Sequence, residues 1–441
     1  MRIAFVSPNR EQLPDPVVPL GLLYMMAVAG DQHDKHLIDL CFEEAPLETL
    51  GRELQHVRPD LVAIGMRNIQ NADYTGTRTT LDYYDEVVRT VRAQTDAPVV
   101  MGGGGFSIIP GELVRRFGLD YGVAGEGELP FAQLVARLAS GTRDVGGIPG
   151  VYGPDGAPVS PVRPTGRHDF LDIRHNVRPD RRALSPRYYE HSGIGSIQTK
   201  RGCALRCDYC TYPLIEGRVI RQRYAEDVAE EWDEMLRAAP AIEHVFVVDA
   251  VFNLPPEHGR QVCRALVERG VRSAWTCYIN PIRFEQDLAE LMAAAGCVGV
   301  EIGSDSGTDA GLQRLNKGFT TEHIRRTSEL CRSVGIKDCH TFVLGAQGET
   351  LDDVERSLDF IEALDPYSAI LMAYKDDREA VDAELAARLG AFREQVLERI
   401  AERARPHRRW AVPSTGLRFS ARLFNALRRS GLRGPLWQHV V

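Results

Sequence analysis

The chain of 441 residues lacks several features that define common classes of protein. No apolar run approaches the roughly 20 residues that span a bilayer, and no basic segment with a long apolar core follows Met1, so neither a transmembrane segment nor a secretory signal is expected. The nine cysteines are odd in number and scattered, which excludes a regular disulfide framework and favours a reducing cytoplasm. The net charge of −8 gives no reason to expect a nucleic acid as partner.

The first part of the chain predicts a parallel α/β domain over residues 1–140. Short apolar runs alternate with amphipathic segments of helix length, which is typical of a sheet with helices on both faces. In such sheets, ligands bind beyond the carboxyl ends of the strands. Residues 141–190 are rich in Gly, Pro, Asp and Arg and are expected to form a linker. The expected strands are 3–6, 37–40, 61–64, 99–101 and 121–123.

A second series of strands and helices is expected over residues 191–375. About six such units predict an incomplete, TIM-like (β/α)6 barrel with its active site at the carboxyl ends of the strands. Residues 376–441 are expected to form a short helical segment, in which nine arginines after Ala401 face one carboxylate, Glu402. This segment is either a solvated face with arginine stems over apolar surface or a cap that contacts an anionic substrate or a partner. The expected strands are 195–199, 244–248, 274–279, 298–302, 340–344 and 369–372.

Three closely spaced cysteines carry the most specific motif of the chain. Cys203, Cys207 and Cys210 lie between an expected strand and an expected helix. A cubane iron–sulfur cluster takes four ligands and is normally held by four cysteines, so three cysteines would leave one iron open. A zinc site usually shows two separated pairs of ligands, and no second pair stands at a matching spacing here.

With Tyr209 before the last cysteine, this motif resembles the cluster loop of the radical S-adenosylmethionine (SAM) superfamily. The resemblance implies a [4Fe–4S] cluster on the three cysteines, with SAM chelating the open iron and being cleaved to a deoxyadenosyl radical. It also implies an electron donor such as flavodoxin or ferredoxin. Four arginines flank the motif and either balance the charge of the cluster or are surface cations; they are Arg201, Arg218, Arg221 and Arg223.

Polar residues at later strand ends match what a SAM site needs. Asp249 follows the second strand of this series and suits the ammonium group of SAM. Residues 301–307 resemble the superfamily's strand end that holds the ribose and carboxylate, and residues 345–350 resemble its glycine-rich turn beside the adenine. Each is also ordinary turn chemistry when taken alone. The residues expected to bind SAM are Tyr209, Asp249, Glu301, Ser304 and Asp305.

Four blocks in the first part resemble the cobalamin-binding domain that precedes many radical SAM methyltransferases. They are PLGLLYMM, RNIQN, GGGGFS and GEGE, each after an expected strand, and the glycine run would let backbone approach a large flat ligand. The resemblance implies a Rossmann-like fold and cobalamin as cofactor. The residues expected to bind it are Pro19, Leu20, Gly21, Leu22, Arg67, Asn68, Gly102, Gly103, Gly104, Gly125 and Glu126.

The loop after the first strand departs from one cobalamin-binding pattern. Cobalamin mutases and methionine synthase carry Asp-x-His-x-x-Gly there, whereas residues 8–14 read PNREQLP and contain no histidine. A bound cobalamin is therefore expected to lack a histidine ligand on its lower face, which Arg67 or Asn68 would face instead. A lost cofactor site is the alternative.

These motifs predict a cobalamin-dependent radical SAM methyltransferase, which moves a methyl group from SAM through methylcobalamin to an unactivated carbon. The substrate is expected to be a small molecule, natural-product or lipid-like, and the arginine-rich end favours an anionic group. No protein acid or base is assigned, because Tyr278, His340 and Tyr374 fit a cavity or a packing role equally. Two alternatives stay open: a rearrangement, oxidation or cyclisation that uses cobalamin without methyl transfer, and a non-catalytic sensor of cobalamin or SAM.

Overall fold

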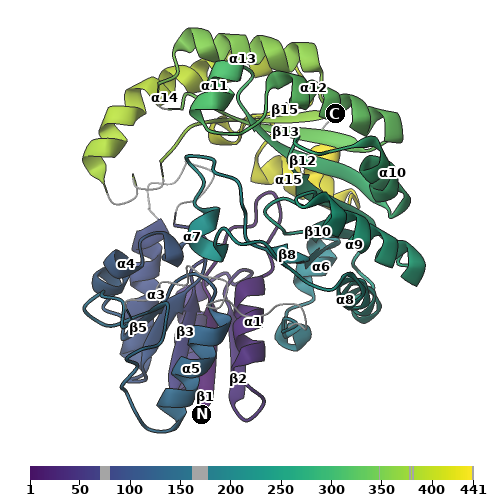
Figure 1. The fold of residues 1–441 in the computed structure, drawn as a ribbon. Coiled ribbons are helices and arrows are strands. Elements are labelled where there is room, and N and C mark those ends of the chain that lie inside the picture. The colour runs from purple at the N-terminus through teal and green to yellow at the C-terminus, as the bar shows by residue number, and fades with distance from the viewer. Residues whose placement is uncertain (70–79, 161–176, 347, 377–378, 380–381, 440–441) are drawn as a thin grey trace.

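Two mostly parallel sheets, one from each half of the chain, organise the protein (Figure 1). The computed structural model describes residues 1–69, 80–160, 177–346, 348–376, 379 and 382–439. The sheet of the first half lies at the bottom of Figure 1, the second sheet lies at the top, and the short helix α7 (Tyr212–Glu216) lies between them. Among the described residues, every helix is too short or too polar to cross a lipid bilayer.

The first sheet has the strand order β2-β1-β3-β4-β5-β6. The first strand pairs in parallel with the second on one side and with the third on the other, which creates a switch point where ligands bind in such folds. All five expected strands are present, and an antiparallel sixth strand falls in the segment expected to be a linker. The bounds are β1 (Arg2–Ser7), β2 (Asp34–Asp39), β3 (Leu61–Gly65), β4 (Val99–Gly102), β5 (Tyr121–Val123) and β6 (Val151–Tyr152).

Amphipathic helices cover this sheet. In α3, the buried residues Leu81, Tyr84, Val88 and Val91 recur every three or four positions, as on one face of a helix. Helices α2 and α4 each carry proline in the first turn, where no backbone donor is lost. The bounds are α1 (Leu20–Val28), α2 (Pro46–Val57), α3 (Thr80–Gln94), η1 (Phe106–Ile108), α4 (Pro110–Phe117) and α5 (Glu128–Ala139).

The second sheet is a parallel, open barrel segment with the order β15-β14-β13-β12-β11-β10-β7. The six expected strands occur in the expected order. The segment after residue 376 is mainly helical, as expected, and also adds a seventh strand of two residues. The bounds are β7 (Ile194–Ile197), β10 (His244–Val247), β11 (Ala274–Ile279), β12 (Cys297–Asp305), β13 (Lys337–Leu344), β14 (Ser368–Ala373) and β15 (Trp410–Ala411).

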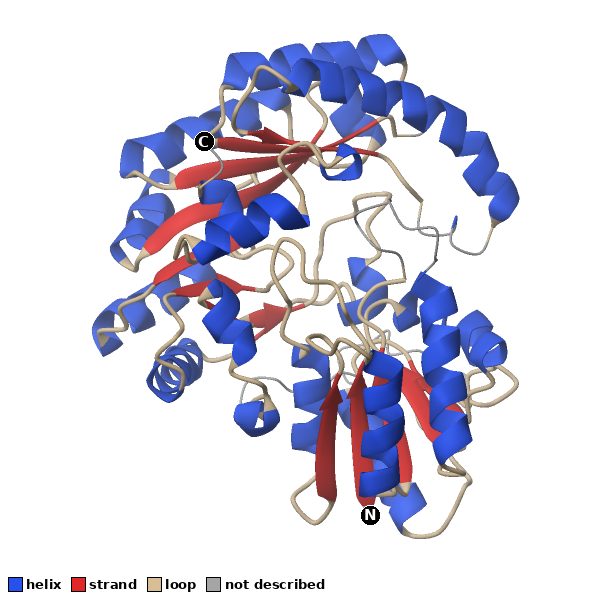
Figure 2. Cartoon of the chain, turned by 180° about the vertical axis from the view of Figure 1, so that it is seen from behind, coloured by secondary structure: helices blue, strands red, loops and turns tan. Residues whose placement is uncertain are grey.

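Helices lie along the outer face of this second sheet, as Figure 2 shows. The principal ones are α8 (Ala225–Ala238), α9 (Pro256–Arg269), α10 (Gln286–Ala294), α11 (Asp309–Arg314), α12 (Thr321–Val334), α13 (Leu351–Leu364) and α14 (Ala383–Ala404). Helix α15 (Ala421–Arg429) lies on the side toward the first sheet, where its Arg428 pairs with Asp15 (Figure 1). Shorter elements are η2 (Arg181–Ala183), α6 (Arg187–Ser192), β8 (Lys200–Arg201), β9 (Arg221–Gln222), η4 (Pro413–Thr415) and η5 (Leu436–Gln438).

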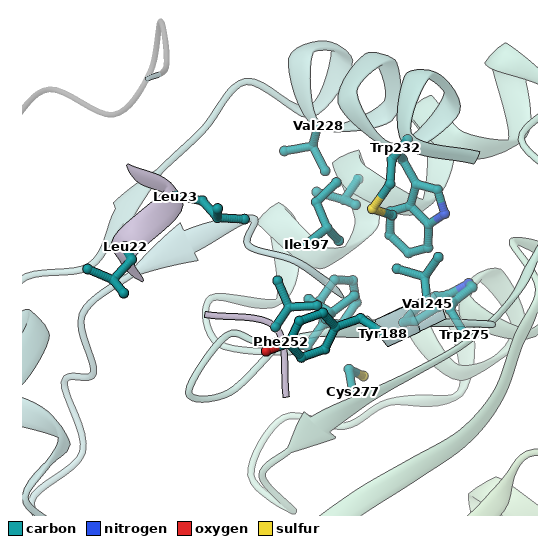
Figure 3. Packing of buried hydrophobic residues seen from close by; sticks show 14 of the residues in the cluster. Leu22, Leu23, Tyr188, Ile197, Val228, Trp232, Val245, Phe252, Trp275 and Cys277 are labelled. Atoms are coloured by element: carbon teal, nitrogen blue, oxygen red, sulfur yellow. The ribbon is translucent and has the colours of Figure 1, made fainter. Parts of the chain in front are cut away.

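The two halves share a hydrophobic core, part of which Figure 3 shows. Trp275 on β11 meets Trp232 of α8 and Phe252 edge to face, with ring centroids 6.0 and 5.3 Å apart. Such pairs add to the free energy of burying the rings. The same cluster continues through Leu23 of α1 to Phe5 of β1, so the first sheet and the barrel segment pack as one body.

Candidate active site

The three motif cysteines lie on a loop between β8 and α7, and all three thiols are free and half-buried. Glycine is required at the start of this loop, because Gly202 has φ +85° and a Cβ there would lie 2.1 Å from the carbonyl oxygen of Val219. Burial raises the pKa of Cys207 and of Cys210, and the negative charge of neighbouring cysteines raises both further. The three thiols therefore lie within electrostatic range of one another.

This arrangement suits a cluster rather than a single ion. Within the described part of the chain, no group of three His, Cys, Asp or Glu side chains could hold one metal ion. A cubane differs, because each thiolate binds a separate iron atom and the sulfurs need not converge on one point. Cys203, Cys207 and Cys210 thus fit the three-cysteine set of a [4Fe–4S] cluster.

The turn after α11 contacts the cysteine loop, and this contact is not predicted from the sequence. The Nδ2 atom of Asn316 donates to the carbonyl oxygen of Arg206 at 2.8 Å, and Nζ of Lys317 donates to the hydroxyl of Tyr209 at 3.1 Å. Lys317 is buried and also pairs with Asp305. The only signal in the sequence is a lone lysine in an Asn-Lys-Gly turn, which is usually a surface turn.

The structure brings three of the expected SAM residues near this loop. The hydroxyl of Tyr209 donates to Asp305, whose charge is balanced by Lys317. Ser304 is buried, and its hydroxyl hydrogen-bonds Nδ1 of His340 at 2.8 Å. His340 is therefore part of a buried polar network rather than of a cavity wall. The roles of these residues toward SAM remain predictions.

The carboxylate of Asp249 already has partners within the protein. Its carboxylate is buried and pairs with Nζ of Lys200 at 3.0 Å. The same group accepts from the backbone N–H of Thr199 at 2.7 Å and from the hydroxyl of Thr199. Both oxygens are thus occupied by neighbouring protein groups, and a contact with the ammonium of SAM stays a prediction.

A cavity of about 830 Å³ lies between the two sheets. It is lined by residues from the strand ends of the first sheet, from the inner face of the barrel segment and from the end of the chain. Asn68 alone of the expected cobalamin residues is outside the lining, and its amide donates to Glu11 at 3.5 Å. The expected cobalamin residues that line it are Pro19, Leu20, Gly21, Leu22, Arg67, Gly102, Gly103, Gly104, Gly125 and Glu126.

Part of the glycine run is needed for a reason internal to the fold. A Cβ on Gly103, which has φ +112°, would lie 2.5 Å from the carbonyl oxygen of Met66, and a Cβ on Gly105 would lie 2.6 Å from the carbonyl carbon of Asn68. The run therefore packs against the loop after β3, in addition to lining the cavity. Two of the residues in the RNIQN block, Gln70 and Asn71, lie outside the described residues, as does Gln347 of the later glycine-rich turn.

The cavity offers no histidine as a cobalt ligand within the described residues. Arg67 lines it with a half-exposed side chain, and its Nη1 lies 3.7 Å from Glu11. Glu11 belongs to the loop that replaces the histidine-bearing pattern. The glycine-lined wall lets a flat cofactor approach the backbone closely, and Arg67 is the cation beside that wall.

The arginines that flank the cysteines are mostly buried and paired, so they are not simple surface cations. Arg201 lies 2.5 Å from Glu128 and 3.2 Å from Glu126, and Arg221 lies 2.5 Å from Glu126. The side chains of these two arginines and two glutamates are at most 12% exposed. These pairs tie the GEGE block of the first sheet to the cysteine loop. Arg223 pairs with Glu231 at 2.7 Å, while the exposed guanidinium of Arg218 donates to the carbonyl oxygen of Leu205 at 2.9 Å.

The arginine-rich end of the chain is docked on the rest of the protein. Arg403 contacts three carboxylates of α13, and Arg428 of α15 makes a buried bidentate pair with Asp15. Arg409 and Arg418 line the cavity. Trp437 also lines it, and its indole N–H donates to Glu301 at 2.9 Å.

Two protein families match the chain: the radical SAM superfamily over residues 197–361 and the B12 binding domain over residues 8–135. Over 426 residues it is 30% identical to tryptophan 2-C-methyltransferase from Streptomyces laurentii, which covers 82% of this chain and 70% of that protein. It is 27% identical over 378 residues to an uncharacterized methyltransferase from Pyrococcus horikoshii, covering 83% and 78%.

A solved structure resembles the whole architecture. The radical SAM methyltransferase TsrM from Kitasatospora setae, with cobalamin and a [4Fe–4S] cluster bound, superposes with a TM-score of 0.74 at 30% identity. The match covers 84% of this chain and 72% of that protein. A second structure of TsrM, with tryptophan as substrate and a SAM analogue bound, matches equally well.

Proposed function

Since the chain belongs to the cobalamin-binding radical SAM superfamily, we propose that it methylates a carbon atom of a small molecule held in the cavity between its two sheets. It is an enzyme of the cobalamin-dependent methyltransferase class, and its cofactors are a [4Fe–4S] cluster, SAM and cobalamin. The single observation that carries the proposal is the cavity of about 830 Å³, which the glycine-rich loops of the first sheet and the inner face of the barrel segment line together.

Each part of this site has a role that the geometry supports. The cofactors supply the activated methyl group and the one-electron chemistry, and the protein supplies binding, orientation and exclusion of water. Cys203, Cys207 and Cys210 would hold the cluster. Tyr209 and Asp305 would contact SAM beside it, while the loops after β3, β4 and β5 would hold cobalamin. The buried pairs of Arg201 with Glu126 and Glu128 keep the two sets of loops in one relative position.

The lining of the cavity supports an aromatic or similarly apolar substrate. Phe246, Tyr278, Phe419, Phe424 and Trp437 all lie on its wall. Because TsrM binds tryptophan and the Streptomyces laurentii relative is a tryptophan methyltransferase, an indole compound is the first substrate to test. An anionic group on the substrate stays a prediction, because the two arginines at the wall already have partners: Arg409 pairs with Asp365 at 2.6 Å, and Arg418 donates to three backbone carbonyl oxygens.

The test is a product analysis with the reconstituted enzyme. The anaerobically reconstituted protein is incubated with tryptophan, SAM and a reductant, either a chemical one or the flavodoxin or ferredoxin that we propose as its electron donor. Methyl transfer yields methylated product together with S-adenosylhomocysteine, and deoxyadenosine formed in step with product indicates hydrogen abstraction. A rearrangement would yield no S-adenosylhomocysteine linked to turnover, and a sensor would yield neither. Absence of both compounds with every acceptor tried would overturn the proposed function.

A further inference from the structure

Most acidic groups on the cavity wall are neutralised by arginine. Five carboxyl side chains line the cavity within the described residues. The neutralised ones are Asp15, which pairs with Arg428, and Glu126 and Glu128, which pair with Arg201. Glu216 instead accepts from the side-chain amide of Gln198 at 2.8 Å and from the backbone N–H of Gly202 at 3.1 Å, and burial raises its pKa to about 7 although the charge of Arg201 opposes the rise. A buried carboxylate next to a guanidinium needs no further cation. The three paired groups are therefore committed to the fold, and Glu216 is held by two donors beside the cysteine loop.

Glu301 differs from all four, because the hydrogen bonds of the described residues give it neither an arginine partner nor a backbone donor. Its partners in the described part of the chain are the indole N–H of Trp437, at 2.9 Å, and the hydroxyl of Tyr278. Both are neutral donors. Glu301 thus has two hydrogen bonds that fix its orientation and no cation that balances its charge.

The surrounding strands hold this carboxyl group at the wall. Glu301 on β12 is the register partner of Tyr278 on β11 and of Cys339 on β13. Gly299, two residues earlier on the same face of β12, makes room for the ring of Trp437, because a Cβ there would lie 2.7 Å from that ring. Tyr278 has 42% of its surface accessible and lines the cavity, so the space beside Glu301 is open to a ligand.

Burial without a cation raises the pKa of Glu301 to about 7. The charge of Glu301 in turn raises the pKa of Tyr278 and that of Cys339, while Arg67 acts in the opposite sense on Tyr278. A desolvated carboxylate that lacks a cation is unfavourable. A ligand that brings a positive charge to this position therefore gains more binding free energy than a neutral ligand of the same shape.

We propose that Glu301, Tyr278 and Trp437 form a substrate subsite that binds a protonated amine. This inference deepens the proposed function and rests on it, since it assumes that the substrate occupies this cavity. SAM also carries an ammonium group, but Tyr209, Ser304 and Asp305, which lie toward the cysteine loop, are not among the residues of the cavity wall. Glu301 is expected from the sequence to bind SAM, but it lies on this wall, apart from those three residues, and the geometry assigns the amine beside it to the substrate.

The test compares three indole probes by calorimetry with the cobalamin-loaded protein: tryptamine, neutral 3-ethylindole and anionic indole-3-propionate. The wild type is expected to bind tryptamine about tenfold or more tightly than 3-ethylindole at pH 8, as a charge-assisted hydrogen bond provides. Glu301→Gln should abolish this preference, and Trp437→Phe should reduce it. Ser196→Ala removes another polar group from the same cavity wall and should keep the preference.

Two further measurements separate a specific role from a structural one. The preference for tryptamine should rise between pH 6 and pH 8 in the wild type, because Glu301 loses its proton near pH 7 while the amine stays charged. This rise should vanish in Glu301→Gln. The affinity for SAM should be unchanged in that variant.

Several results would overturn the assignment. The wild type could prefer the neutral or the anionic probe, or bind none of the three. The Glu301→Gln variant could keep the preference for tryptamine, or it could lose its affinity for SAM while still binding tryptamine. Failure of the proposed function is seen separately, as the absence of methylated product and S-adenosylhomocysteine in the turnover assay.

Discussion

Replacing Arg428 by methionine should destabilise the protein strongly, because it leaves a buried carboxylate without its cation. The guanidinium of Arg428 binds both oxygens of Asp15, with Nε at 2.7 Å and Nη2 at 2.5 Å, and the two side chains are only 4% and 11% exposed. Removing one partner of a buried pair costs about 3–5 kcal/mol, whereas replacing both partners costs far less. We expect the free energy of unfolding of Arg428→Met to fall by an amount in that range.

The pH dependence of this loss has a definite sign. Burial already raises the pKa of Asp15, and Arg428 opposes that rise. Without Arg428, the pKa of the folded-state carboxyl rises further above its unfolded value. Because a carboxyl group with a raised folded pKa favours the folded state only while it is protonated, the variant should lose more stability relative to the wild type at pH 8 than at pH 5.

Urea unfolding followed by tryptophan fluorescence measures both effects. Arg429→Met is the matched control, since Arg429 is the next residue of α15 and is exposed. The double variant Asp15→Asn, Arg428→Met should recover a large part of the loss, because no charge is then left buried. A free energy of unfolding for Arg428→Met within about 0.5 kcal/mol of the wild type, the range of ordinary surface substitutions, would refute the reasoning.

Three further predictions follow from single sites. Cys207→Ala should reduce the iron and sulfide content after anaerobic reconstitution to near background, and a full cluster content in this variant would contradict the cluster assignment. Gly103→Ala should lower the free energy of unfolding by about 1–3 kcal/mol and weaken hydroxocobalamin binding, since a Cβ at φ +112° meets the oxygen of Met66 at 2.5 Å. Gly21→Ala on α1, where a Cβ meets nothing within 4 Å, should not lower the free energy of unfolding, and equal losses in the two variants would argue against the clash. Hydrogen bonds from His340 and other groups lower the pKa of Asp338 from 3.8 to about 2. Ionised Asp338 should therefore add about 2 kcal/mol to the free energy of unfolding above pH 4, and this contribution should be lost as the pH falls toward 2. An Asp338→Asn variant whose free energy of unfolding depends on acid pH in the same way as the wild type would exclude this.

The elements of both sheets could be predicted from the sequence because their signal is local. Apolar runs such as those of β3 and β11 predict strands within a residue or two of the observed bounds, and three cysteines at fixed spacing define a cluster loop wherever the chain places it. The seventh barrel strand, β15, could not be predicted from the sequence, because two residues are too few to show a period. It pairs with β14 only after α14 returns the chain to the sheet.

The contacts that complete the site could not be predicted, because each joins distant residues. Trp437 reaches Glu301 across 136 positions, and Lys317 reaches Tyr209 across 108. In the sequence these residues look like a packing aromatic and a surface lysine. Only the folded chain shows that Gly299 leaves room for the indole ring of Trp437.

Glu126 illustrates how the structure adds to a motif. As part of the GEGE block it is expected to bind cobalamin, and it does line the cavity. Both of its oxygens, however, accept from Arg221, and one also accepts from Arg201, two residues before Cys203. A buried ion pair contributes little net stability compared with a well-packed apolar contact, but it holds its partners in a defined geometry. The acidic residues of this block therefore hold the loops of the first sheet at a set position relative to the cluster loop. This role accounts for them without direct contact between Glu126 and cobalamin.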